Sequence, residues 1–110
     1  MPKHEKPADL DIFVFSLAVT ERHQRYFEEN YPSLELPTVE VSNGRKYARL
    51  FVNRGNDSKS VWAFVNRETG EIFKPAGWSA PAKHARGNVF SEQGGMEAVT
   101  PGMPFIKYLK

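Results

Sequence analysis

A basic segment in the middle of the chain is the part of the sequence best suited to bind a ligand. From residue 74 to residue 90 it carries Lys74, Lys83, His84 and Arg86 around Trp78, and it contains no carboxylate. Cations beside an aromatic ring suit an anionic or aromatic ligand, because they neutralise negative charge while the ring offers a stacking surface. These residue types predict a binding site rather than a catalytic one.

A second group of cations precedes this segment, on expected strands and turns. Its members are Arg45, Lys46, Arg49, Arg54, Lys59 and Arg67. Lys and Arg side chains neutralise phosphates, so the two groups together predict one groove for a nucleic-acid backbone, with Trp78 or Tyr47 stacking on a base. The candidate nucleic-acid-binding residues are Arg45, Lys46, Arg49, Lys59, Lys74, Trp78, Lys83, His84 and Arg86.

Each candidate also has a structural interpretation. Trp78 is equally suited to fill the edge of the core, because tryptophan is highly buried on average. The cations are equally typical of a solvated sheet surface, where lysines discourage pairing between sheet edges.

The net charge of +2 hides an uneven distribution along the chain. Residues 1–44 carry four Lys and Arg against eight Asp and Glu, whereas residues 45–90 carry nine against three. This asymmetry indicates two unlike surfaces, of which the basic one attracts anions at long range.

The sequence offers no recognisable catalytic or cofactor-binding motif. Cysteine is absent, so thiolate chemistry, disulfides and Cys-based zinc sites are excluded. His4, His23 and His84 match no metal-ligand spacing, and no serine lies in a nucleophile-elbow context. We therefore expect no catalytic residue, no metal and no cofactor.

A length of 110 residues is typical of one domain. We expect a loose tail over residues 1–8 and a single domain over residues 9–110. The apolar run of residues 12–19 is too short to cross a bilayer and follows Asp9 and Asp11, where a signal peptide carries positive charge. The sequence therefore predicts a cytoplasmic protein without a membrane partner.

Residues 9–31 have the spacing of a helix. Apolar residues recur three and four positions apart at Leu10, Phe13, Val14, Leu17 and Ala18. Asp9 or Asp11 is suited to cap the start, and Pro32 ends the helix. The apolar stripe weakens after Thr20, which predicts a kink or restart there, and a strand at residues 12–15 is the alternative.

The apolar period then changes to two, which predicts strands at residues 38–42, 45–53, 60–66 and 71–74. Asn43-Gly44 is typical of a two-residue hairpin turn, and Gly70 closes the turn between the last two strands, which brings Val65 near Ile72. In the second strand, Lys46, Ala48, Leu50 and Val52 share one face, while Tyr47, Arg49 and Phe51 share the other. Residues 79–87 predict a short basic helix with Pro81 at its first position and Gly87 past its end.

Together these elements predict an α+β fold. One N-terminal helix packs on an antiparallel meander of about four strands, followed by a short basic helix and a C-terminal extension. In this extension, residues 105–109 either add a last strand or dock on the core.

Two resemblances carry functional expectations. Residues 60–90, S-V-W-A-F-V-N-R-E-T-G-E-I-F-K-P-A-G-W-S-A-P-A-K-H-A-R-G-N-V-F, resemble a segment of small uncharacterised proteins encoded by tailed bacteriophages. This resemblance implies a phage protein that acts in the bacterial cytoplasm and brings no functional residues with it. The order of a helix, three main strands and a basic helix is similar to the double-stranded-RNA-binding domain, although here Gly87 interrupts the last helix and an extra strand comes first.

Two main functions follow from these patterns, and a structural or virion-assembly role is a third alternative. The first is a nucleic-acid-binding accessory protein whose basic residues contact phosphates. The second is a modulator or inhibitor of a host enzyme or defence system, whose many aromatic residues anchor a protein interface.

Overall fold

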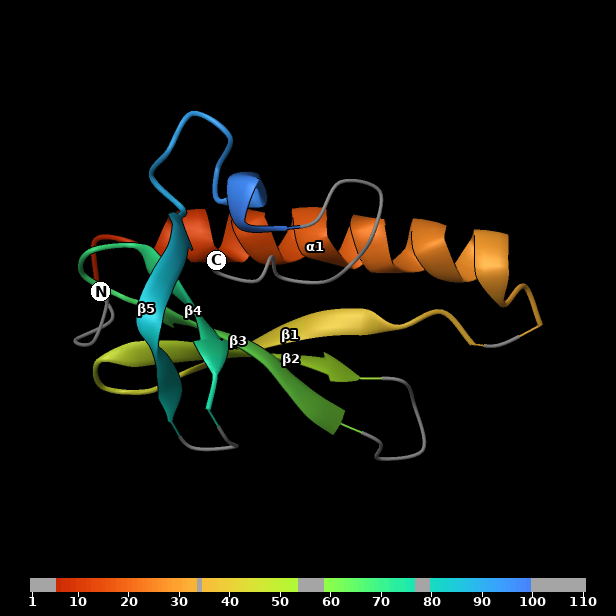
Figure 1. Ribbon diagram of the computed structural model, residues 1–110, viewed down its shortest axis with the longest axis horizontal. Helices are drawn as coiled ribbons and strands as arrows, with labels where there is room; N and C mark the ends of the chain where they lie inside the picture. The colour runs from red at the N-terminus through yellow and green to blue at the C-terminus, as the bar shows by residue number, and fades with distance from the viewer. Residues whose placement is uncertain (1–5, 34, 54–58, 77–79, 100–110) are drawn as a thin grey trace.

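The protein folds as one α-helix packed across a five-stranded antiparallel sheet (Figure 1). The computed structural model describes residues 6–33, 35–53, 59–76 and 80–99. The elements are α1 (Asp9–Asn30), β1 (Thr38–Asn43), β2 (Tyr47–Asn53), β3 (Lys59–Asn66), β4 (Glu71–Pro75), β5 (Pro81–Asn88) and the 3₁₀ turn η1 (Met96–Ala98). The strands lie in chain order, so the predicted α+β class with an antiparallel meander is confirmed.

Helix α1 begins at Asp9 and runs without interruption past Thr20 to Asn30. The predicted restart near Thr20 and the alternative strand at residues 12–15 are therefore wrong. Asp9 is the first helical residue rather than the cap, because Ala8 occupies the N-cap position. The polar stretch that weakens the apolar stripe has a packing role: the Thr20 hydroxyl accepts a hydrogen bond from the Val39 backbone N–H on β1 at 3.0 Å.

The apolar stripe that predicts this helix does not face the sheet. Leu10 is 72% exposed, and Phe13, Val14 and Leu17 are each 55% exposed. The residues that α1 buries form a different stripe: Ile12, Phe15, Ser16, Val19 and His23. Apolar residues therefore occupy two sides of the helix, and tertiary contacts select the buried one.

Aromatic contacts with Trp62 of β3 lie on the buried side of the helix. The ring of Phe15 lies 6.0 Å from that of Trp62, measured between centroids, and His23 meets the same indole edge-on at 5.8 Å. An aromatic pair adds geometric preference to the area that it buries. Phe15 is 1% exposed, so this contact anchors the helix on the sheet.

The β3–β4 hairpin matches its prediction. Val65 pairs with Ile72, and Gly70 closes the turn with a φ of 79°. That backbone conformation strongly favours glycine. A Cβ at Gly70 would also lie 2.7 Å from the Asn88 side-chain oxygen. Both the positive φ and this close approach therefore disfavour a larger residue.

The β1–β2 hairpin turn lies two residues later than predicted. Asn43 pairs with Ala48, and the Gly44 N–H donates to the Tyr47 carbonyl at 2.9 Å, so Arg45 and Lys46 occupy the turn. Gly44 serves close approach, because a Cβ there would meet the Tyr47 carbonyl oxygen at 2.9 Å. The displacement preserves which side chains share a face and moves two cations to the tip of the hairpin.

The predicted basic helix at residues 79–87 is wrong, and a strand takes its place. Residues 81–88 form β5, which pairs with β4 through Pro75–Pro81 and Ile72–Gly87. The unpaired edge of β4 supplies hydrogen-bond partners that a two-turn helix cannot match, and an edge strand tolerates proline at its start. Gly87 allows η1 to approach, since a Cβ there would lie 2.8 Å from that of Ala98.

The core fills the space between the sheet, α1 and η1. We call the side of the sheet that α1 packs on the covered face, and the opposite side, which carries Tyr47, Arg49 and Phe51, the far face. Strand β2 alternates as predicted from Tyr47 onward, with Ala48, Leu50 and Val52 buried on the covered face, whereas Lys46 lies in the turn and is exposed. The remaining buried apolar residues of this cluster are Ala8, Ile12, Phe15, Val19, Val39, Ala63, Val65, Ile72, Val89, Ala98 and Val99.

Two predicted segments fall outside the described residues in whole or in large part. The expected tail at residues 1–8 is described only from Lys6, where Ala8 is buried and donates its N–H to the Arg67 carbonyl at 2.9 Å. The expected last strand at residues 105–109 lies wholly outside them. Of the helices in the described ranges, none combines the length and apolar character needed to span a bilayer.

Candidate nucleic-acid interface

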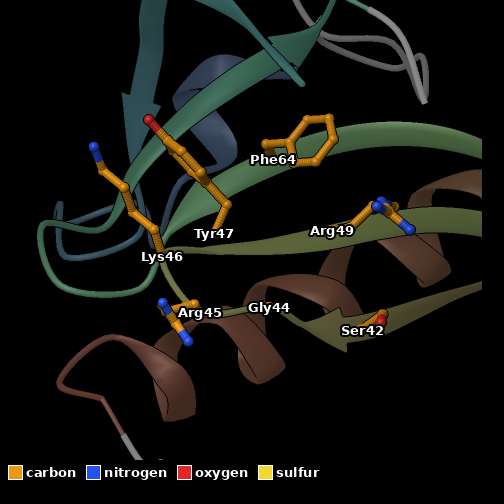
Figure 2. A pocket seen from close by; sticks show the side chains of 7 residues that line it. All are labelled: Ser42, Gly44, Arg45, Lys46, Tyr47, Arg49 and Phe64. Carbon is orange, nitrogen blue, oxygen red and sulfur yellow. The ribbon is translucent and has the colours of Figure 1, made fainter. Parts of the chain in front are cut away.

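A basic pocket opens at the β1–β2 hairpin, where the turn meets the far face of the sheet (Figure 2). Its volume is about 240 Å³. The lining residues are Ser42, Gly44, Arg45, Lys46, Tyr47, Arg49 and Phe64. Three of the nine candidate residues, Arg45, Lys46 and Arg49, therefore line one cavity together with Tyr47 of β2.

Strand alternation and pairing explain why these side chains meet. Tyr47 and Arg49 are two residues apart on β2, so both project to the far face. Arg49 pairs with Ser42 of β1 on one side and with Phe64 of β3 on the other. The displaced turn then adds Arg45 and Lys46 at the end of the same strand, and Figure 2 shows Lys46 running beside the Tyr47 ring.

Cations lie against aromatic rings throughout this region. The Lys46 ammonium is 5.4 Å from the centroid of Tyr47, and the Arg49 guanidinium carbon is 5.8 Å from that of Phe64. Further along β2, the Lys59 ammonium is 5.3 Å from the centroid of Phe51. These distances fall within the range of cation–π attraction, which orders long basic side chains on the surface.

The aromatic rings of the far face support one another. Tyr47 meets Phe64 and Phe73 edge-on, at 6.3 and 5.9 Å between centroids. Phe64 is only 3% exposed, so its ring serves packing. Tyr47 and Phe51 are half-buried, which leaves part of each ring accessible to a ligand.

Arg67 belongs to the basic part of the sequence but has a structural role. Its Nε and Nη2 donate to the two carboxylate oxygens of Asp9 at 2.9 and 2.6 Å, and its side chain is 5% exposed. The same residue holds the hairpin turn, because its Nη1 donates to the Gly44 carbonyl and its backbone N–H to that of Lys46. Sequence reasoning grouped Arg67 with the ligand-binding cations and missed this positioning role.

The paired guanidinium also changes the titration of Asp9. The side-chain hydrogen bonds from Arg67 hold the pKa of the Asp9 carboxyl below its usual value, against the opposing effect of burial. A charge-assisted bidentate pair of this kind favours the ionised carboxylate. Asp9 therefore stays charged over the physiological range and keeps the hairpin tied to the start of α1.

The other candidate residues are distributed over the sheet. Lys59 lies at the start of β3 on the far face, beside Phe51. Lys74 follows Phe73 on β4, where the pairing with β5 is irregular.

Lys83, His84 and Arg86 lie on β5, the edge strand, with β3 and β4 between them and β2. Trp78, together with Arg54, lies outside the described residues. The structure thus brings the first part of the basic sequence together at the hairpin and places the β5 cations at the other edge of the sheet.

Metal binding finds no support in the described residues, where no three His, Asp or Glu side chains cluster. His23 is buried, with its Nδ1 3.0 Å from the Val19 carbonyl oxygen and its ring against Trp62. His84 is an exposed residue of β5.

Comparison with known protein families identifies the family to which the chain belongs. A family model matches residues 11–101, which span the sheet, the hairpin pocket and η1. The chain belongs to the DUF7717 family, a family of unknown function. No curated protein and no solved structure matches it. Membership of DUF7717 therefore brings no activity with it.

Proposed function

We propose that this protein is a non-catalytic accessory protein that binds nucleic acid through the far face of its sheet at the β1–β2 hairpin. The observation that carries the proposal is the pocket that Arg45, Lys46 and Arg49 line together with Tyr47. Lys and Arg neutralise phosphates, and a tyrosine ring accepts a stacked base. A pocket with three cations and no carboxylate in its lining suits an anion better than a neutral ligand.

The fold supports a sheet-based mode of binding. The second helix that contacts phosphates in the double-stranded-RNA-binding domain is replaced here by β5, so the mode of that domain is not proposed. The resemblance of residues 60–90 to tailed-phage proteins supports a phage origin and action in the host cytoplasm, which we include in the proposal.

Fluorescence anisotropy with labelled oligonucleotides tests this function. We expect binding at about 50 mM salt that weakens steeply by about 200 mM, because bound phosphates release counterions. Lys46→Ala in the pocket should weaken binding, whereas Arg25→Ala should not, because Arg25 lies on the exposed side of α1. Absence of binding to any DNA or RNA at low salt contradicts the proposal.

A second candidate function rests on the outer side of α1. Leu10, Phe13, Val14 and Leu17 form an exposed apolar stripe one helical turn after another. Asp11 lies on the same helix near one end of the stripe, whereas Asp9 and Glu21 are already paired with Arg67 and Arg25. The expected partner is a host protein with an apolar groove that carries a lysine or arginine at one end, since such a surface complements both features.

Capture from a nuclease-treated host lysate distinguishes this candidate from nucleic-acid binding. A specific partner should bind the wild type and a Leu36→Ser control but not a Leu10→Ser/Leu17→Ser variant, and salt should weaken its capture. Leu36 is a suitable control because it is exposed and lies outside α1. Equal capture by all three proteins contradicts the candidate, and self-association lost in the double variant assigns the stripe to a second copy instead.

A further inference from the structure

The far face carries a row of cation–aromatic pairs that begins in the pocket and continues beyond it. Within the described residues, the pairs are Lys46 with Tyr47, Arg49 with Phe64, and Lys59 with Phe51. Their β2 members, Tyr47, Arg49 and Phe51, occupy every second position of the strand. The row therefore follows β2 from the hairpin to its other end.

The spacing along this row differs from the spacing of bases in a duplex. Every second residue of an antiparallel strand advances by about 6.8 Å, whereas stacked bases in duplex DNA rise by about 3.4 Å. A nucleic acid that places successive nucleotides along the row must therefore be unstacked and extended. Extended single strands meet this requirement, whereas the bases of a duplex stay stacked on one another and cannot lie on the rings of Tyr47 and Phe51.

The two accessible rings are at the two ends of the row. Tyr47 and Phe51 are half-buried, whereas Phe64 between them is buried beneath Arg49. The arrangement offers a stacking ring, a central cation and a second stacking ring, which fits about three nucleotides. Base stacking on aromatic side chains combined with a basic track is the usual basis of single-strand binding.

An acidic residue beside the row indicates the path of the bound nucleic acid. Glu40 of β1 lies across from Phe51 and accepts a hydrogen bond from the Asn53 amide at 2.7 Å. Its negative charge disfavours phosphate on the β1 side, while Lys59 attracts phosphate on the β3 side. A single-stranded nucleic acid that enters at the hairpin pocket therefore leaves the far face over β3.

We propose that the far face selects single-stranded over double-stranded nucleic acid, with bases stacked on Tyr47 and Phe51 and phosphates on Lys46, Arg49 and Lys59. This inference rests on the proposed function and specifies its ligand class. It assigns Phe51 a binding role that its sequence context does not indicate.

Competition between single and double strands of one sequence tests the inference. Anisotropy is measured with an oligonucleotide of about 12 nucleotides and with its duplex, at equal salt. We expect the single strand to bind at least about 10-fold more tightly. Phe51→Leu keeps an apolar side chain but removes the ring, and it should weaken single-strand binding by about 5- to 150-fold, the range for loss of one stacked base.

A matched control separates stacking from general loss of structure. Phe90→Leu removes an exposed ring that is outside the row, and it should leave the affinity unchanged. Circular dichroism establishes that each variant is folded, and Tyr47→Leu provides a second test at the other end of the row. Equal affinity for the duplex, or single-strand binding unchanged in both Phe51→Leu and Tyr47→Leu, overturns the inference while the proposed function stands. Absence of binding to either form overturns the proposed function itself.

Discussion

The two faces of the sheet use the same strands for opposite purposes. On the covered face, β2 presents Ala48, Leu50 and Val52, which are between 0 and 3% exposed. On the far face the intervening residues are Tyr47, Arg49 and Phe51, all half-buried and accompanied by cations. Because neighbouring residues of a strand point to opposite sides, one seven-residue segment contributes to the core and to the candidate binding surface at once.

This division teaches that stability and binding should respond to different substitutions. Changes beneath α1 should unfold the protein, and changes on the far face should leave it folded while altering its affinity for a ligand. The same contrast holds within α1, where two stripes of apolar residues differ in what covers them.

The largest expected effect contrasts two phenylalanines of α1. Phe15→Ala should lower the free energy of unfolding by about 3–5 kcal/mol, because the ring is 1% exposed and packs on Trp62. Phe13→Ala should lower it by less than about 1 kcal/mol, since that ring is 55% exposed. Urea denaturation measures both, and equal losses would show that the outer stripe is covered.

The second contrast is between two arginines of the basic region. Arg67→Ala should cost about 3 kcal/mol, because it leaves the Asp9 carboxylate without its partner and releases the hairpin turn. Arg45→Ala, at the exposed tip of that turn, should change stability by less than about 0.5 kcal/mol. Thermal denaturation distinguishes them, and a silent Arg67→Ala variant would contradict the positioning role.

The Asp9–Arg67 pair also predicts how stability varies with pH. The folded pKa of Asp9 lies below the unfolded value of 3.8, so the pair stabilises the fold above that pH. This contribution is lost as the pH falls through the folded pKa. Asp9→Asn should cost about 2 kcal/mol at pH 7 and progressively less below about pH 4, as measured by urea denaturation at several pH values. A constant difference down to acid pH would contradict the pKa shift.

Two adjacent glycines test packing near the covered face. Gly94 and Gly95 both have positive φ, at 62 and 95°, so alanine strains the backbone at either position. Only at Gly95 would the new Cβ meet neighbours, at 2.7 Å from Ile72 and 2.9 Å from Phe15. Gly95→Ala should therefore cost at least about 1 kcal/mol more than Gly94→Ala in denaturant titrations. Equal costs would show that η1 does not pack closely on the core.

The smallest expected change in stability comes from a substitution on the far face. Lys59→Ala should leave the free energy of unfolding within about 0.5 kcal/mol of the wild type, because the side chain is exposed. The same substitution should weaken nucleic-acid binding, so the ratio of the two effects sharpens the division between the faces. A loss of stability larger than the loss of binding free energy would make Lys59 a structural residue.

Local patterns allowed the sheet to be predicted better than the packing of the helix. The β3–β4 hairpin follows from Gly70 and the alternation on either side, and the two sides of β2 follow from its period of two. The buried side of α1 does not follow, because both of its apolar stripes have helical spacing. The stripe that is buried is the one that meets distant parts of the chain, such as Trp62, 47 residues beyond Phe15.

The errors at β5 and at the first turn have the same origin. Residues 79–87 have helical end signals, but the edge of β4 offers a longer set of partners, which local sequence does not reveal. Asn43-Gly44 is typical of a turn, but the pairing of β1 with β2 places the turn at Arg45 and Lys46. The observed position of the turn contributes to the candidate site, because Arg45 and Lys46 are two of its cations.

The salt dependence of oligonucleotide affinity tests the central claim most directly. The logarithm of the association constant is measured against the logarithm of salt concentration for the wild type and for Arg45→Ala/Lys46→Ala. If both side chains contact phosphates of a single strand, the slope should become shallower by about 1.4 in the variant. An identical slope in the two proteins would show that the hairpin cations do not meet the nucleic-acid backbone, and the assignment of the pocket would be wrong.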